Sequence, residues 1–271
     1  MIKEITIGQY FPGNSFVHRL DPRVKIILTV VFLVVIFMSK NFFSFLVPFV
    51  LVILTMILSG VPVKMYLKNL KAILPILLFT SVLNVFYVTG GTSLFDWRFI
   101  HITTKGIYTA IFISLRLILI IVASAALTYT TTPTLLTDGI ERLLSPLTKL
   151  HIDVHTFAMM MTLALRFIPT LIEEIDRIMN AQKARGADLE TGGLMKRARA
   201  LVPIIVPLIV SSVKRAYELA NAMQCRCYTG GKGRTRMKKM KVGLRDYLTM
   251  LVFVASTAGV VVLNIFFEAV I

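Results

Sequence analysis

The sequence predicts an all-α integral membrane protein that crosses the bilayer about five times and carries long amphipathic helices on its cytosolic side. Of its 271 residues, 56% are hydrophobic and only 16% are charged, whereas a soluble domain is about a quarter charged. The apolar residues form continuous runs, which are typical of membrane helices and not of a β-barrel. The net charge of +16 comes from basic residues beside these runs, as in cytosolic loops, and does not indicate nucleic-acid binding.

The first span is predicted to begin at Pro22. Lys25 and Lys40 enclose 14 uncharged residues, which make about 21 Å of helix against roughly 30 Å of hydrocarbon. We therefore expect the helix to start at Pro22, with Asp21 as its N-cap, and to continue past Lys40. Arg23 and Lys25 are expected to extend their side chains toward the membrane surface.

Four further apolar runs complete the predicted spans. They lie within residues 41–63, 72–95, 106–130 and 247–267. Lysines and arginines collect before the first span, between the second and third, and after the fourth. The positive-inside rule therefore places the N-terminus and the charged region in the cytosol and the C-terminus outside.

Residues 138–241 hold more than half of the chain's lysines and arginines. Apolar pieces at 154–171 and 200–213 interrupt this region, and Pro203 and Pro207 break the second. We predict amphipathic helices that lie along or below the membrane face. The predicted organisation is a cytosolic segment at 1–21, four transmembrane helices at 22–130, cytosolic or interfacial helices at 131–241, and a last transmembrane helix at 242–271.

A six-residue phrase, Asn-Ala-x-x-x-Arg, occurs twice in the charged region, at 180–185 and at 221–226. Small residues flank both arginines. Ala184 and Gly186 flank Arg185, and Cys225 and Cys227 flank Arg226. Acidic residues after Pro169 and basic residues before Gly186 predict a helix that Pro169 opens or kinks and that a left-handed Gly186 ends. A second helix is expected from about Pro207 to near Arg226.

An exposed arginine at a helix end, beside small residues, can enter a groove and donate hydrogen bonds to carboxylate or carbonyl oxygens of a partner. The competing interpretation is an ordinary solvated or lipid-facing arginine that complements the helix dipole. The repetition of the phrase with the same small flanks favours two similar sockets on a partner.

Together with three other stretches, the two phrases resemble the T component of energy-coupling factor (ECF) transporters, which are ABC importers of vitamins and metal ions. The stretches are His-Arg-Leu-Asp-Pro-Arg-Val-Lys at 18–25, Leu-Arg-Phe-Ile-Pro-Thr at 165–170, and 132–147, so the resemblance covers roughly residues 16–236. It implies a non-catalytic membrane scaffold without cofactors, whose partners are two ABC ATPases and a substrate-binding membrane protein, the S component.

The resemblance also implies roles for residues. Arg185 and Arg226, with their flanks Ala184, Gly186, Cys225 and Cys227, would end two coupling helices and dock into grooves on the ATPases. Cysteine at 227 departs from the more typical glycine, which leaves the cap of the second helix open. The apolar faces near 154–165 and 200–213 are the expected S-component surface. The segment 8–15 is closer to the shared, multi-vitamin version of the family than to its dedicated cobalt or biotin version.

Two other hypotheses compete with the scaffold. A self-contained transporter would bind its solute at Arg116, the one charge in the fourth span, although this arginine could also snorkel or pair with Asp138 or Glu141. A membrane metalloenzyme would use His151 and His155, but no convincing third ligand follows them, and the Cys225-x-Cys227 pair also lacks partners. The glycine-rich stretch 230–233 lacks the spacing of a phosphate-binding loop, so 230–241 is predicted to be a basic loop that contacts anionic lipid.

Overall fold

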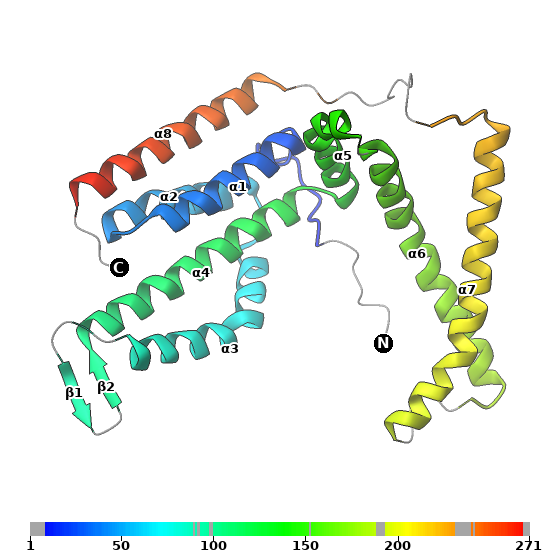
Figure 1. Ribbon diagram of the computed structural model, residues 1–271, viewed down its shortest axis with the longest axis horizontal. Coiled ribbons are helices and arrows are strands. Elements are labelled where there is room, and N and C mark those ends of the chain that lie inside the picture. The colour runs from blue at the N-terminus through cyan, green and yellow to red at the C-terminus, as the bar shows by residue number, and fades with distance from the viewer. Residues whose placement is uncertain are drawn as a thin grey trace. The chain divides into compact units, whose positions relative to one another are not determined.

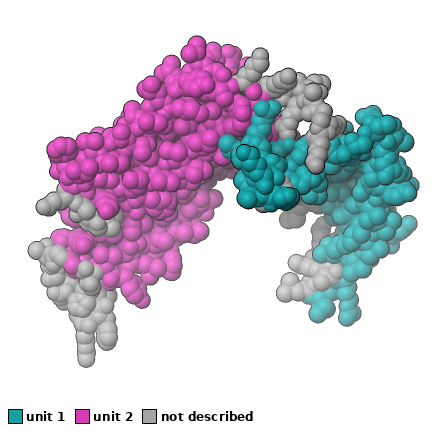
Figure 2. All heavy atoms as spheres, turned by 45° about the horizontal axis from the view of Figure 1, so that its top comes forward, with its two compact units in different colours: residues 1–7, 141–238 teal, residues 8–140, 239–271 magenta. Residues whose placement is uncertain are grey.

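The computed structural model describes residues 9–88, 90, 93–97, 100–151, 153–187, 193–230, 240 and 242–267. The chain divides into two compact units (Figure 2). One consists of residues 8–140 and 239–271 and is called the bundle unit here. The other consists of residues 1–7 and 141–238 and is called the hairpin unit.

Helices make up most of both units (Figure 1). In chain order the elements are α1 (Pro22–Met38), α2 (Phe42–Ser59), α3 (Val63–Tyr87), β1 (Ser93–Trp97), β2 (Ile100–Thr103), α4 (Thr104–Thr130), α5 (Pro133–Leu144), the 3-10 helix η2 (Ser145–Leu150), α6 (Val154–Ala184), α7 (Leu194–Cys225) and α8 (Leu244–Phe266). The predicted all-α class is confirmed, with one addition that the sequence analysis did not foresee. The strands β1 and β2 form a small antiparallel hairpin with Trp97 opposite Ile100.

Within the described residues, six helices are long and apolar enough to cross a membrane, namely α2, α3, α4, α6, α7 from Arg199 onward, and α8. The chain is therefore a multi-pass membrane protein. The helix α1 has only 17 residues, which is about 25 Å of helix. In the bundle unit α1, α2, α4 and α8 run side by side, and α3, which contains Pro75, is bent and packs along α4 (Figure 1).

The start of α1 is as predicted, but its end is not. The Asp21 side chain accepts a hydrogen bond from the Arg23 N–H at 2.9 Å, and Pro22 occupies the first turn. The helix ends at Met38 and does not continue past Lys40, because the chain turns there to begin α2. A side chain of α8 satisfies a carbonyl at the end of this short helix, because Asn264 donates to the Met38 carbonyl at 2.7 Å.

The prediction that Lys25 snorkels to the membrane surface is wrong. Its side chain is buried, and its Nζ donates to the Thr130 carbonyl at 3.0 Å and to Thr131 Oγ1 at 3.1 Å. The last carbonyls of α4 have no donor within their own helix and carry partial negative charge, so they attract the ammonium group. Lys25 thus joins α1 to the end of α4.

In the hairpin unit α6 and α7 run antiparallel along each other (Figure 1). Three contacts set their register, from Gln182 to Pro203, from Glu174 to Arg215 and from Met159 to Tyr228. The Tyr228 hydroxyl lies 2.9 Å from the Met159 sulfur. The contacts are spread along both helices, from Met159 near the start of α6 to Gln182 near its end.

Pro169 lies inside α6 and does not open it, and α7 begins earlier than the sequence analysis predicted. Asp153 caps α6 by accepting from the Thr156 N–H at 3.2 Å, and the helix continues through Pro169 to Ala184. The helix α7 begins at Leu194 and continues through both of its prolines. A proline removes one helical hydrogen bond and bends a helix without ending it when other groups satisfy the freed carbonyl.

A specific contact satisfies one such carbonyl. Because Pro207 has no N–H, the Pro203 carbonyl lacks its helical donor, and the Gln182 side chain of α6 donates to it at 3.4 Å. The proline bend of α7 is therefore bonded to the last turn of α6.

Candidate functional site at two arginine-capped helix ends

The end of α6 is locked by two crossed backbone hydrogen bonds. Arg185 is the C-cap, and Gly186 follows in the left-handed conformation that was predicted, with φ of +83°. The Gly186 N–H donates to the Lys183 carbonyl, and the Ala187 N–H donates to the Gln182 carbonyl, both at 3.0 Å. This pattern is the Schellman motif, which satisfies the last carbonyls of a helix.

The end of α7 has the same geometry without a glycine. Arg226 is the C-cap, and Cys227 adopts φ of +54°. The Cys227 N–H donates to the Gln224 carbonyl at 2.9 Å, and the Tyr228 N–H donates to the Met223 carbonyl at 3.0 Å. The question that the sequence left open at position 227 is thereby resolved, because the cysteine takes the left-handed position that glycine takes in the first motif.

The two arginines therefore occupy equivalent places. Each is the last residue before the left-handed turn, and each side chain is exposed, as are the flanking Ala184, Gly186, Cys225 and Cys227. Among the described residues neither guanidinium group donates a hydrogen bond. Each lies at the negative end of a helix dipole, where a cation is favourable. The small flanks leave the guanidinium accessible on both sides.

The antiparallel register places the two arginines at different ends of the hairpin unit. Arg185 lies three residues beyond Gln182, which contacts Pro203, and Arg226 lies 23 residues beyond Pro203 on α7. That length corresponds to about 35 Å at 1.5 Å per residue. A single small socket could not accept both side chains at that separation.

Comparison with known proteins identifies the family. The family model described as "Cobalt transport protein" (CbiQ) matches residues 13–237. The chain is 50% identical over 253 residues to the energy-coupling factor transporter transmembrane protein EcfT of Clostridium kluyveri, with 93% of each chain covered. It is 46% identical to the EcfT of Ruminiclostridium cellulolyticum over 267 residues, covering 98% of this chain and 100% of the relative.

The chain belongs to the EcfT family. The resemblance found in the sequence is confirmed over nearly the same range, and with it the role of a transmembrane component of an energy-coupling factor transporter.

In this EcfT family member, Arg116 has a structural environment. Its Nη2 donates to the Ser39 carbonyl at 2.9 Å, and its guanidinium carbon lies 4.9 Å from the centre of the Phe112 ring. The partners considered in the sequence analysis, Asp138 and Glu141, are replaced by this carbonyl at the end of α1. Phe112 belongs to α4 itself, but the guanidinium carbon also lies 5.7 Å from the centre of the Phe37 ring on α1, so the Ser39 carbonyl and the Phe37 ring together stabilise the contact of α4 with α1.

The two histidines do not form a metal site in the described part of the chain, where no cluster of three or more histidine, cysteine, aspartate or glutamate side chains could hold an ion. His155 Nδ1 lies 2.9 Å from Glu141 Oε1 and joins α5 to α6. His151 is the left-handed cap of η2, with φ of +63°. Cys225 and Cys227 are free thiols. Of the predicted basic loop, residues 231–239 and 241 lie outside the described residues.

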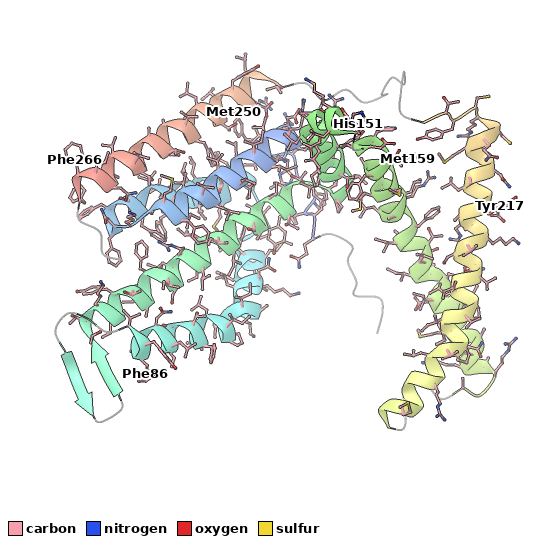
Figure 3. The ribbon with its side chains drawn as sticks, in the orientation of Figure 1. Phe86, His151, Met159, Tyr217, Met250 and Phe266 are labelled. Atoms are coloured by element: carbon pink, nitrogen blue, oxygen red, sulfur yellow. The ribbon has the colours of Figure 1, made fainter. Side chains whose placement is uncertain are left out.

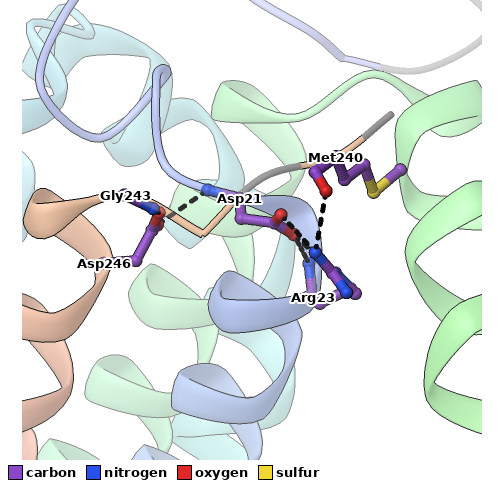
Figure 4. Close-up of polar contacts among 5 residues, drawn as sticks. All are labelled: Asp21, Arg23, Met240, Gly243 and Asp246. Carbon is purple, nitrogen blue, oxygen red and sulfur yellow. Dashed lines mark hydrogen bonds and ion pairs between the residues drawn. The ribbon is translucent and has the colours of Figure 1, made fainter. Parts of the chain in front are cut away.

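The sequence analysis missed one polar cluster, centred on Asp246 at the start of α8 (Figure 4). Its buried carboxylate accepts from the Asp21 N–H at 2.9 Å and from the Gly243 N–H at 2.8 Å. Arg23 in turn donates to the Asp21 carboxylate through both Nε and Nη2. The spacing Gly-x-x-Asp at 243–246, an acid three residues after an N-cap, was the available signal.

Proposed function

We propose that this chain is the scaffold of an ECF-type ABC importer and transmits the motion of two ATPase subunits through Arg185 and Arg226 to a membrane-embedded S component. The observation that carries the proposal is the pair of equivalent helix ends, each with an exposed arginine held one residue before a Schellman turn. Each arginine and its two small neighbours are called a tip here, which gives an α6 tip of Ala184, Arg185 and Gly186 and an α7 tip of Cys225, Arg226 and Cys227.

The spacing of the tips supports two ATPase subunits as partners. Tips about 35 Å apart along α7 suit one groove on each of two similar proteins. In a groove that excludes water, the planar guanidinium group can donate paired hydrogen bonds to a carboxylate or to backbone carbonyls. The chain contains no phosphate-binding loop motif, so we assign ATP hydrolysis to the partners.

Force applied at either tip would spread through the hairpin unit. Gln182 joins the last turn of α6 to the bend of α7, and Tyr228, directly after the α7 tip, contacts Met159 near the start of α6. Because each tip is bonded to the other helix, closure of the ATPases would move α6 and α7 together. A tip that could swing freely would lose this motion before it reached the membrane.

Away from the two tips, the apolar faces of α6 and α7 are suited to contact the S component. Apolar side chains along α6 and α7 are exposed, including Met160, Val206 and Val210, and Tyr217, 69% exposed, points away from α6 (Figure 3). Exposed apolar patches of this kind mark protein or lipid contacts. We place the N-terminus and the two tips in the cytosol, α6 and α7 along or below the cytosolic membrane face, and the C-terminus outside, following the distribution of basic residues.

Uptake measurements test the proposal. Removal of a buried interfacial arginine commonly costs more than about 2 kcal/mol, or roughly 30-fold in affinity per tip. We expect Arg185→Ala and Arg226→Ala each to weaken co-purification with the ATPases, and the double variant to abolish ATP-dependent uptake. Arg177→Ala on α6 and Lys214→Ala on α7 are matched controls, because both side chains are exposed cations on the same helices.

The double variant must be shown to insert and fold, by its yield and its melting temperature in detergent. Undiminished uptake by this folded variant would refute the assignment of the two arginines, whatever the controls do.

The proposed cargo is a vitamin or another micronutrient. A dedicated cobalt, nickel or biotin importer is the second candidate, and the "Cobalt transport protein" description of the matching family model favours its metal version. Reconstitution with S components of different specificity separates the two. A shared scaffold supports uptake with several S components, whereas a dedicated one supports uptake with one.

A further inference from the structure

The bundle unit contains an apolar cavity of about 260 Å³ between α1, α2, α4 and α8. The segment before α1 also lines it, through Phe16, Val17 and Leu20. For comparison, a cavity of roughly 150 Å³ lined by apolar side chains stays dry and accepts benzene. The space is therefore large enough for hydrocarbon.

The polar side chains of the lining leave no hydrogen-bond donor free for the cavity. Four threonines contribute to it, and each hydroxyl donates to a carbonyl of its own helix, at positions 29, 55, 130 and 249. The Lys25 ammonium group is also engaged, with three oxygen acceptors. Water finds no free side-chain donor there, only acceptor lone pairs on hydroxyls that are already hydrogen-bonded, whereas a buried water molecule needs two to four polar contacts.

The cavity is open to the hydrocarbon phase. Leu54 and Leu58 of α2 line it and are 43% and 39% exposed, and Leu248 of α8 lines it and is 63% exposed. Side chains that face both the cavity and the outside mark its mouth between these two helices. In the bilayer, the surrounding medium at that mouth is lipid.

One basic residue, Arg245, lies at the same end of α8 as the cavity. It precedes Leu248 and Thr249 by three and four residues, so it lies one turn nearer the helix start on the cavity face. Its side chain is exposed.

We propose that this cavity binds one acyl chain of an anionic phospholipid, whose headgroup lies against Arg245. The chain enters between α2 and α8 and fills the space that these helices leave with α1 and α4. The lipid thereby becomes part of the packing of the transmembrane scaffold.

Native mass spectrometry and thermal unfolding of the full chain, purified in mild detergent, test this proposal. We expect wild type to retain one phospholipid and to gain melting temperature when dioleoylphosphatidylglycerol is added. Ala123→Phe on α4 and Thr55→Phe on α2 fill the cavity from two different helices, and each is expected to lose the bound-lipid peak and the thermal response. Ile57→Phe is the control, because Ile57 is 71% exposed on α2 and does not line the cavity.

Two cavity-filling variants are used so that one can still be measured if the other does not fold. Arg245→Gln is expected to retain a lipid but to lose the preference for phosphatidylglycerol over phosphatidylcholine at equal concentration. A filled, folded variant that retains lipid as well as Ile57→Phe would overturn the proposal, and so would a wild-type chain that shows neither a bound lipid nor a thermal response.

Discussion

Asp246→Ala is expected to loosen the bundle unit at the junction of α1 and α8. The buried carboxylate is the acceptor for two backbone donors, the N–H groups of Asp21 and Gly243. These bonds are 2.9 and 2.8 Å long and involve a charged acceptor, which makes them stronger than bonds between neutral groups. The alanine variant leaves both donors without this partner.

The magnitude follows from the burial of the two donors. A buried donor left without an acceptor costs about 1–3 kcal/mol. Asp21 is only 6% exposed, so water cannot replace the lost bond, and its N–H belongs at the upper end of that range. Gly243 is exposed, and its N–H can be hydrated. We therefore expect Asp246→Ala to lower the free energy of unfolding by about 2–4 kcal/mol, and Asp246→Asn, which keeps one acceptor, by about half of that.

Thermal or denaturant unfolding in detergent measures the effect, with Tyr247→Ala as control because Tyr247 is 63% exposed in the same turn. One opposing effect is built into the site. The Asp21 carboxylate lies in the same cluster, so removal of Asp246 also relieves repulsion between two negative charges. Arg23, bonded twice to Asp21, already compensates much of this repulsion. Unchanged or raised stability in Asp246→Ala would show that repulsion outweighs the two hydrogen bonds and would refute the reasoning.

Two further changes test the junctions described above. Lys25→Met removes the donor from Thr130 and Thr131 while keeping the length of the side chain, and is expected to lower the free energy of unfolding by about 2 kcal/mol. Lys40→Met, at an exposed position, is the control. Equal melting temperatures of the two variants would contradict a stabilising role of the buried Lys25 ammonium group. Cys227→Gly relieves the left-handed strain of an L-residue and is expected to stabilise the end of α7 by about 1 kcal/mol. Slower amide hydrogen exchange at the α7 tip reports this gain, and faster exchange would argue against it.

The predictable parts of this fold were those fixed by local chemistry. Pro22 after Asp21 marked the start of α1, and Gly186 marked the end of α6, because both signals depend on the residue itself and its immediate neighbours. The continuous apolar runs gave the helices α2, α4 and α8 for the same reason. Cys227 was undecided because cysteine has no strong preference for the left-handed region, and only the hydrogen bonds of the formed helix end decide it.

Three of the failures involve contacts between segments far apart in the chain. Lys25 has a snorkelling pattern in sequence, yet two of its three acceptors are 105 and 106 residues away. Pro207 was expected to begin a helix, but Gln182 from another helix satisfies the carbonyl that the proline frees. Asp246 was overlooked because one of its two donors is 225 residues away. A residue whose partner is distant shows its role only when both elements are in place.

The residue after the arginine distinguishes the two tips. Their sequences differ at the position after the arginine, glycine in one and cysteine in the other, yet both form the same pair of backbone bonds. A cysteine held at φ of +54° is less favourable there than glycine by about 1 kcal/mol, so helix stability alone does not account for it. If the tips dock as proposed, the strain is tolerated because Cys227 packs beside Arg226 in its socket, where a small apolar side chain contributes contact that glycine lacks. On that basis Cys227→Gly should stabilise the free chain and weaken ATPase binding, whereas a gain in both would leave the cysteine without a role in docking.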